Sequence, residues 1–220
     1  MSTKTVATQL VPQLRDLIAN GSFPPNTKLK LQELGQTFGV SLSSVREALL
    51  VLSTQGFVVG EDQRGFRVVD ASAANLAEVT TLRAQFEPYA LRIAIERQDR
   101  AWEEKLVGIF YRLSRIEKED GYVPFLDEWE RAHREFHLCM IGGCQMPLLL
   151  QFCSNLHDMS DRYRRIYLSR DMPPQRDVAA EHSAIIDAIL KRDADTACEL
   201  LRTHSQRTGA AALERLQALK

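Results

Sequence analysis

The feature that most limits the fold is a change in hydrophobic periodicity near residue 70. From Leu76 onward, apolar residues recur at intervals of three and four, which is the period of an amphipathic helix. Glycines and prolines interrupt this pattern. The sequence therefore predicts helices over about 75–98, 101–118, 123–142, 146–169, 175–191 and 193–216. We expect this part of the chain to form an all-α helical bundle.

The first 70 residues mix helical and β patterns. Helices are predicted over 6–18, 31–38 and 42–54, with Ser41 as the N-cap of the third. Two short β-prone runs, 57–59 and 66–69, flank a polar loop, so we expect a hairpin. The predicted fold is mainly α, with a winged helix-turn-helix at 1–70, a linker of small residues at 71–74 and the helical bundle at 75–220.

Composition and charge exclude several classes of protein. The formal net charge of −1 argues against a protein that coats nucleic acid through basicity alone, but it leaves room for a local site. No apolar run approaches the roughly 18 residues of a membrane span, and the N-terminus lacks the apolar core of a signal peptide. The four cysteines form no CxxC pair and are interpreted as reduced thiols. We therefore expect a cytoplasmic protein with no membrane partner.

The third predicted helix has two different faces. Its apolar residues between 45 and 52 share one face and can pack on the first two helices. The other face carries Ser43, Ser44 and Arg46 near the N-terminus, the end that recognition helices insert into the major groove. Hydroxyls, helix N–H groups and a guanidinium suit phosphates and base edges. Arg64, in the hairpin loop, could enter the minor groove. The residues alone also allow a winged domain that makes protein contacts.

All five histidines follow residue 130. His133 and His137 are four residues apart, so their side chains lie on one face of a helix and both imidazoles can reach one metal ion. His182 and His204 lie on the two later predicted helices. The spacing alone leaves open that these are ordinary surface or core histidines, and for the lone His157 that interpretation is kept.

The stretch GVSLSSVREALLVLSTQGFV, followed by QRGFRVV, resembles the DNA-binding domain of the GntR family of bacterial transcription regulators. Leu42 departs from the family, which usually has an arginine there, so the operator sequence of better-known relatives cannot be transferred. A missing guanidinium would remove about 1–3 kcal/mol of base discrimination. The resemblance assigns DNA contacts to Ser41, Ser43, Ser44 and Arg46, with Arg64 and Gly65 at the wing.

The segments HREFH, AAEHSAIIDAILKRDADTACELLRTH and LRAQFEPYALRIA resemble the all-helical FCD-type effector domain of the FadR subgroup of that family. Many members bind a divalent metal with one aspartate and three histidines. The resemblance places His137, His182 and His204 at the histidine positions and His133 at the aspartate position. Four imidazoles favour a borderline metal, Zn²⁺ or else Ni²⁺, over Mn²⁺ or Mg²⁺.

The same resemblance suggests residues for the effector. Arg83 matches the subgroup arginine that pairs with effector carboxylates, although it could instead form a surface salt bridge with Glu87. Arg162 and Tyr163 are candidates for a second wall. FLDEW, HREFH and the following GGC resemble the carbon-starvation-induced regulator branch, which implies a short dicarboxylate effector of the glutarate type.

The function predicted is a metal-dependent transcription repressor that binds a palindromic double-stranded operator as a homodimer and responds to a small mono- or dicarboxylate. One alternative is a hydrolase or oxygenase with a histidine-bound metal and an appended DNA-binding unit. Two observations argue against an enzyme. The sequence has no nucleophile motif, and the candidate base Glu181 immediately precedes His182, so its side chain points about 100° away around the helix. Another alternative is a regulator whose metal is purely structural.

Overall fold

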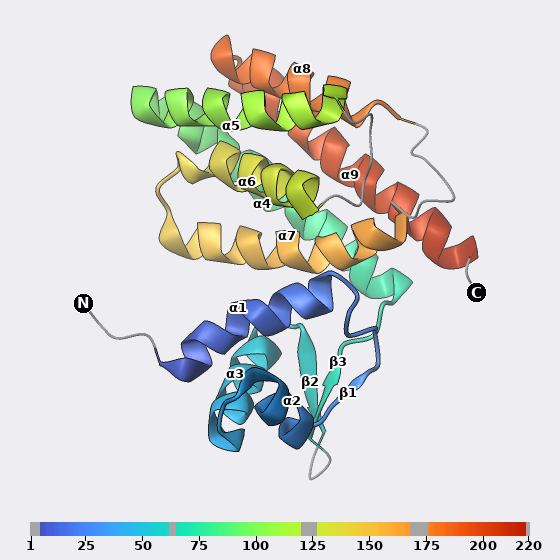
Figure 1. Cartoon of the computed structure of the whole chain (residues 1–220). Coiled ribbons are helices and arrows are strands. Elements are labelled where there is room, and N and C mark those ends of the chain that lie inside the picture. The colour runs from blue at the N-terminus through green and yellow to red at the C-terminus, as the bar shows by residue number, and fades with distance from the viewer. Residues whose placement is uncertain (1–4, 62–64, 120–126, 168–175, 219–220) are drawn as a thin grey trace. The chain divides into compact units, whose positions relative to one another are not determined.

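The computed structural model describes residues 5–61, 65–119, 127–167 and 176–218 (Figure 1). The chain forms two compact units, Met1–Ser72 and Ala73–Lys220. The division falls inside the stretch expected to be a linker, of which Ala73 and Ala74 already belong to a helix. None of the described helices is long and apolar enough to cross a membrane.

Unit 1 contains three helices and a small sheet. The helices are α1 (Val6–Ala19), α2 (Leu31–Phe38) and α3 (Leu42–Thr54), and the strands are β1 (Lys28–Leu29), β2 (Val58–Glu61) and β3 (Gly65–Val68). The predicted hairpin of β2 and β3 is confirmed. The sheet also has a third strand that the sequence did not predict, because β1 pairs with β3 to give the antiparallel order β1-β3-β2. Two residues are too short to show an alternating pattern.

The core of unit 1 forms where α3 packs on α1. Leu14 of α1 and Val45 and Leu49 of α3 are fully buried. Phe57 and Phe66 add the apolar face of the sheet. The helix-turn-helix connection is tight because α2 ends at Gly39 in the left-handed conformation, with φ 64°.

Unit 2 is all helical within its described residues. Its helices are α4 (Ala73–Arg97), α5 (Arg100–Glu119), α6 (Asp127–Gly142), α7 (Pro147–Tyr167), α8 (Val178–Leu190) and α9 (Ala194–Ala218). The fold class predicted from the sequence is therefore confirmed. Helix α8 begins three residues later than expected because Asp177 caps it, its carboxylate accepting from the Ala180 N–H at 2.8 Å. The expected helical residues 123–126, 168–169 and 175 lie outside the described ranges.

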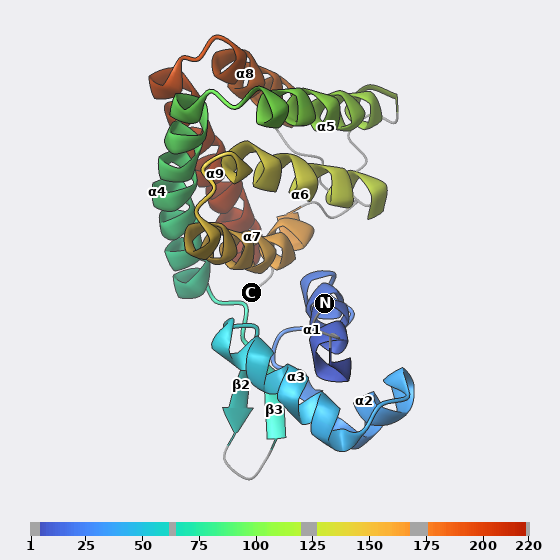
Figure 2. The same ribbon diagram turned by 90° about the vertical axis from the view of Figure 1, so that its left-hand side faces the viewer.

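Two long helices run beside each other in unit 2. Helix α9 packs along α4, and α7 also contacts α4, while α5 lies beside α6 and α8 (Figure 2). The close approach of α4 and α9 depends on Gly209, since a Cβ there would lie 2.3 Å from Thr80 Oγ1. This arrangement turns one face of α6 toward α8 and α9, which is the face that carries the first histidine pair.

Candidate DNA interface and metal centre

The N-terminus of α3 carries a cluster of hydroxyl groups. The Ser41 side chain caps the helix, because its Oγ accepts from the Ser44 N–H at 3.2 Å. Ser41 Oγ also lies 2.8 Å from Ser43 Oγ and 2.9 Å from Ser44 Oγ. Ser43 is exposed and Ser44 half-buried. These hydroxyls therefore surround the N–H groups of the first helical turn, a site suited to phosphate.

Arg46 lies on the exposed face of α3, as the helical pattern predicts, while Val45 and Ala48 are buried. Within the described residues, Arg46 forms no ion pair, so its guanidinium remains available to a partner. Leu42 on the same face is 49% exposed. The exposed face at the start of α3 thus combines hydroxyls, a cation without an ion pair among the described residues, and an aliphatic side chain.

The wing is described at its base. Arg64, the predicted minor-groove residue, lies outside the described residues, and Gly65 opens β3 with φ +94°. Arg67 was not singled out from the sequence. Its Nε donates to Glu61 Oε1 at 2.7 Å and its Nη1 to the Asn26 carbonyl at 2.7 Å. Arg67 therefore ties the two wing strands to the loop before β1.

The four histidines expected to form one site do lie together. His133 and His137 come from α6, His182 from α8 and His204 from α9, and one ring nitrogen from each lies within 4.8 Å of the others. All four side chains are buried. The rings of His133 and His137 have centroids 4.4 Å apart, and those of His182 and His204 are 5.0 Å apart. The cluster can hold a metal ion.

Burial disfavours the charged form of three of these imidazoles, those of His133, His137 and His204. Burial lowers the pKa of His133 well below 6.5, and the Arg164 guanidinium adds to the effect. Burial likewise lowers the pKa of His137 well below that value, and that of His204 to about 3 despite the hydrogen bond to Glu181. Neutral imidazole is the form that coordinates a metal.

Two carboxylates orient two of the imidazoles. His182 Nδ1 lies 3.1 Å from Glu117 Oε1, on α5, and His204 Nδ1 lies 2.8 Å from Glu181 Oε2, on α8. A carboxylate accepts only, so each Nδ1 carries the proton and each Nε2 keeps its lone pair. This is the arrangement that carboxylates impose on metal-binding histidines. The sequence analysis did not single out Glu117, which is 65 residues from His182 in the chain.

Several ring nitrogens in the cluster have no hydrogen-bond partner among the described residues. They are Nδ1 of His133, both nitrogens of His137 and Nε2 of His182. Buried polar atoms are rarely left without a partner in folded proteins. A divalent cation would accept one lone pair from each of these three imidazoles, so the residues present fit the metal.

The charges around the cluster also fit a divalent cation. Three guanidiniums line the cavity beside the histidines, and each is already paired with a carboxylate: Arg83 with Glu87, Arg164 with Glu130 and Asp161, and Arg176 with Glu181. Glu117, bound to His182, adds a fifth carboxylate. With Arg207, which also pairs with Glu181, these described groups carry five carboxylates against four guanidiniums, and the remaining negative charge favours a cation.

Arg83 lines this cavity, and it also pairs with Glu87, the alternative considered from the sequence, but the pair is buried rather than on the surface. Arg83 Nε donates to Glu87 Oε1 at 2.7 Å, and both side chains are 4% exposed. Its Nη1 donates to Ser160 at 2.8 Å and its Nη2 lies 3.2 Å from His157 Nδ1. The cavity has room for about one water molecule, about 10 Å³.

Arg162 and Tyr163 do not line this cavity. Arg162 Nη2 and Tyr163 Oη both donate to Asn75 Oδ1, at 2.9 and 2.8 Å, near the start of α4. Each helical residue is rotated by about 100° from the one before it, so Arg162 and Arg164, two residues apart, point about 200° apart and thus to nearly opposite sides of α7. It is Arg164, with Arg176, that faces the histidines.

His157 and Trp129 are neighbours of the cluster that the sequence did not assign. His157 is fully buried, with its ring centroid 5.3 Å from that of His137. The Trp129 indole stacks on His133 at 4.5 Å and donates to Glu117 at 3.2 Å. A lone histidine on α7 carries no spacing pattern, so only the packing of α7 on the bundle reveals its place.

The geometry gives no support to an enzymatic site at the cluster. Glu181, the base considered from the sequence, accepts from His204 and from Arg207 at 3.2 Å. Burial alone would raise the pKa of Glu181, but the hydrogen bond from His204 and the charge of Arg176 lower it below its usual value. A carboxylate held in this way is a poor proton acceptor.

Comparison with known proteins agrees with both units. Residues 6–68 match the bacterial regulatory proteins of the gntR family, and residues 78–207 match the FCD domain. The chain is 32% identical to the HTH-type transcriptional repressor GlaR of Escherichia coli, over 87% of this chain and 88% of GlaR. It is 34% identical to the HTH-type transcriptional regulator BphR of Paraburkholderia xenovorans, over 87% of this chain and 79% of BphR.

Solved structures show the same fold. The E. coli protein McbR/YncC superposes with a TM-score of 0.82 at 20% identity, covering 99% of this chain and all of that one. The winged unit and the helical unit therefore occur together in proteins of one architecture. The relatives named are transcription regulators rather than enzymes, and the chain belongs to the GntR family of bacterial regulators, with an FCD domain as its second unit.

Proposed function

We propose that the protein is a repressor whose operator binding is controlled by a small carboxylate bound at a metal site in the helical unit. The observation that carries the proposal is the buried group of four imidazoles whose ligand nitrogens lie within 4.8 Å of one another, at His133, His137, His182 and His204. A divalent ion held there, Zn²⁺ or else Ni²⁺, would supply a Lewis-acidic position for an effector carboxylate.

The carboxylates and the guanidiniums around the histidines have different roles at this site. Glu117 and Glu181 hold two imidazoles with their Nε2 atoms free to bind. Arg83, Arg164 and Arg176 bring cationic groups to the adjoining cavity. Because each of them is already paired with a carboxylate, an effector carboxylate must exchange with one of these partners. Such an exchange moves buried side chains and gives the ligand a way to change the shape of the domain.

Elemental analysis tests the metal part of the proposal. Protein purified without a polyhistidine tag should contain close to one metal ion per chain, and the double variant His137→Ala with His204→Ala should contain none. Wild-type protein that takes up neither Zn²⁺ nor Ni²⁺ would rule out the site. Retained metal in His133→Ala alone would rule out only the fourth ligand.

Calorimetry with glutarate tests the effector part. Binding should weaken by about 1.5–3 kcal/mol in Arg83→Ala, the value of a hydrogen bond to a charged group. It should also weaken sharply in metal-stripped protein. Equal glutarate affinity with and without metal, together with metal-insensitive release of DNA, would favour the alternative in which the ion is purely structural.

The proposal includes a homodimer, supported by an exposed apolar surface on unit 2. Phe86 and Tyr89 of α4 are 37% and 54% exposed, and Leu148 and Phe152 of α7 are 84% and 40% exposed. The Phe86 and Phe152 rings meet edge to face at 5.3 Å, so the two helices present one continuous patch. Contiguous apolar surface of this kind marks interaction sites. A two-fold dimer would place two recognition helices on a palindromic operator.

Light scattering after gel filtration tests the dimer. The double variant Tyr89→Asp with Leu148→Asp should be monomeric and should bind operator DNA weakly. Tyr111→Asp on α5 is a matched control, because Tyr111 is 63% exposed and lies outside the patch. A dimeric double variant would show that the patch is not the interface.

A further inference from the structure

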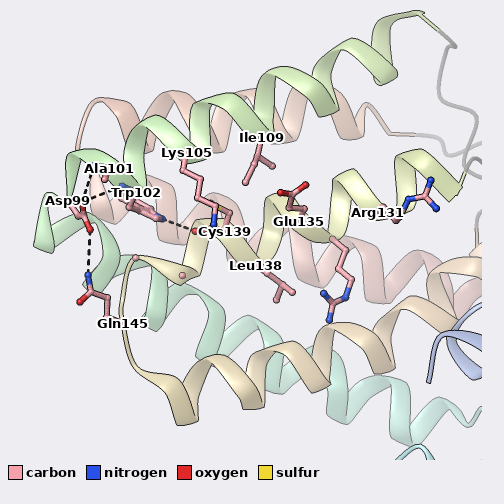
Figure 3. Close-up of a pocket in the computed structure, with 13 residues that line it drawn as sticks. Asp99, Ala101, Trp102, Lys105, Ile109, Arg131, Glu135, Leu138, Cys139 and Gln145 are labelled. Atoms are coloured by element: carbon pink, nitrogen blue, oxygen red, sulfur yellow. Dashed lines mark hydrogen bonds between the residues drawn. The ribbon is translucent and has the colours of Figure 1, made fainter. Parts of the chain in front are cut away.

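A second cavity lies on the other side of α6 from the histidines, between α5 and α6 (Figure 3). Its volume is about 650 Å³, within the range of small-molecule sites. On α5, Trp102, Lys105 and Ile109 contribute from one face of the helix, and Arg131 and Glu135 contribute from α6. None of the four clustered histidines is among its described lining residues. The α5–α6 cavity is thus separate from the metal centre.

One wall of the α5–α6 cavity is an indole ring held in a fixed position. Trp102 Nε1 donates to the Cys139 carbonyl of α6 at 2.7 Å, which pins the ring across the two helices. Asp99 caps α5, because its Oδ1 accepts from the N–H groups of Ala101 and Trp102 at 3.0 and 3.3 Å. A preformed aromatic wall lowers the entropic cost of binding a flat or aliphatic ligand.

Two cations that line the cavity, Lys105 and Arg131, form no ion pair among the described residues. The Lys105 side chain extends from α5 toward Cys139 (Figure 3). The acidic groups nearby are already engaged, since Glu135 accepts from Arg112 at 3.1 Å and Asp99 caps the helix. Arg134, on the same side of α6, is held by Asp158 at 2.6 Å.

We propose that the α5–α6 cavity binds a small organic carboxylate with an aromatic or aliphatic body. The body lies on Trp102 and Ile109, and the carboxylate pairs with Lys105. The apolar wall and the cation come from successive turns of one helix, so a ligand of about twelve heavy atoms reaches both, at about 1.5 Å of helix rise per residue. The site requires neither the metal nor the effector of the proposed function.

Calorimetry with 4-phenylbutyrate as the probe tests this site. The wild-type protein should bind it at millimolar or lower concentration, and the neutral analogue 4-phenylbutan-1-ol at least about tenfold more weakly, because a charged hydrogen bond is lost. Lys105→Ala should show a similar loss, and Lys105→Arg should restore binding. Arg100→Ala is the control, since Arg100 is an exposed cation of α5 outside the cavity.

The two tryptophans allow the bound probe to be located. Trp102 lines the α5–α6 cavity and Trp129 stacks on His133, so each site has its own fluorophore. The probe-induced fluorescence change should persist in Trp129→Phe and vanish in Trp102→Phe. Chelation of metal should leave the affinity unchanged. Absence of binding, unchanged affinity in Lys105→Ala, or loss of affinity on chelation would each overturn the proposal, and the last would assign the probe to the histidine site.

Discussion

The two units of this chain present their candidate functional side chains in opposite ways. In unit 1 most of them fall within six consecutive residues, 41–46, at the start of one helix, with Arg64 and Gly65 at the wing, and Arg46 and Ser43 are exposed. In unit 2 they come from all six helices, α4 to α9, and they are buried and linked by ion pairs and hydrogen bonds. The difference teaches that function and stability are separable in unit 1 and coupled in unit 2.

The largest difference between the two units is expected when the pH is lowered. In metal-free protein, burial lowers the pKa of His133, His137, His157 and His204, so each contributes stability that is present above pH 6.5 and lost as the pH falls below it. At pH 5.5, each of these four histidines lowers the free energy of unfolding by up to about 1.4 kcal/mol relative to its value at high pH. Asp161 acts in the opposite direction, because burial raises its pKa to about 6. Its protonation between pH 7.5 and 5.5 raises the free energy of unfolding by less than about 1 kcal/mol, which offsets only a small part of the loss from the histidines.

Unit 1 contains no histidine and should not respond to pH in this range. Hydrogen exchange measured by mass spectrometry at pH 7.5 and 5.5, corrected for intrinsic exchange rates, resolves the two units. Peptides of α6 and α9 should lose protection at pH 5.5 while peptides of α1 and α3 keep theirs. Equal loss in both units would mean that they unfold together and that the comparison fails.

The next effect in size comes from Arg164, which pairs with Glu130 and with Asp161 at 2.8 Å. Arg164→Met leaves two buried carboxylates without their cation and should lower the free energy of unfolding by about 3–5 kcal/mol. Urea unfolding followed by tryptophan fluorescence measures unit 2, because both tryptophans lie in it. The control is Arg112→Met, whose exposed pair with Glu135 should contribute less than about 1 kcal/mol.

Zinc should stabilise unit 2 by a smaller amount. At a free concentration 100 times its dissociation constant, the ion adds about 2.7 kcal/mol to the free energy of unfolding. In the double variant His137→Ala with His204→Ala, added zinc should leave the urea midpoint unchanged. A zinc-dependent shift that survives in this variant would place the ion elsewhere.

The smallest effect on stability is expected at Arg46. Arg46→Ala should change the free energy of unfolding by less than about 0.5 kcal/mol, because an exposed side chain without an ion pair is removed. The variant should nevertheless fail to retain DNA that the wild-type protein selects from a random library. Wild-type retention would show that the N-terminal turn of α3 does not face the DNA.

The sequence predicts unit 1 closely because its information is local. The bounds of α2 and α3 follow from a glycine turn and a serine cap. The strand β1 could not be predicted in this way. Lys28 and Leu29 become a strand only because they pair with Arg67 and Phe66, almost forty residues later in the chain.

In unit 2 the clustered histidines could be predicted from the sequence, but the residues that orient and surround them could not. His133 and His137 are revealed by helical spacing, and the resemblance adds His182 and His204. Glu117 and Arg176 reach the cluster only through the packing of α5 and of the segment before α8. The structure brings carboxylates to two of the imidazoles, and this tertiary information has no local pattern.

The origin of the four imidazoles on α6, α8 and α9 has a consequence for biosynthesis. Residues 133 and 204 are separated by about 70 residues, several seconds of translation at bacterial rates of roughly 5–20 residues per second. A nascent or truncated chain that stops before His204 carries α6 with its ring nitrogens unsatisfied and α4 without the helix that covers it. Such a chain exposes apolar surface to proteases, while unit 1 can already be complete. The cell would therefore degrade the helical part selectively, and a DNA-binding fragment without its sensor is the product to look for when synthesis is interrupted.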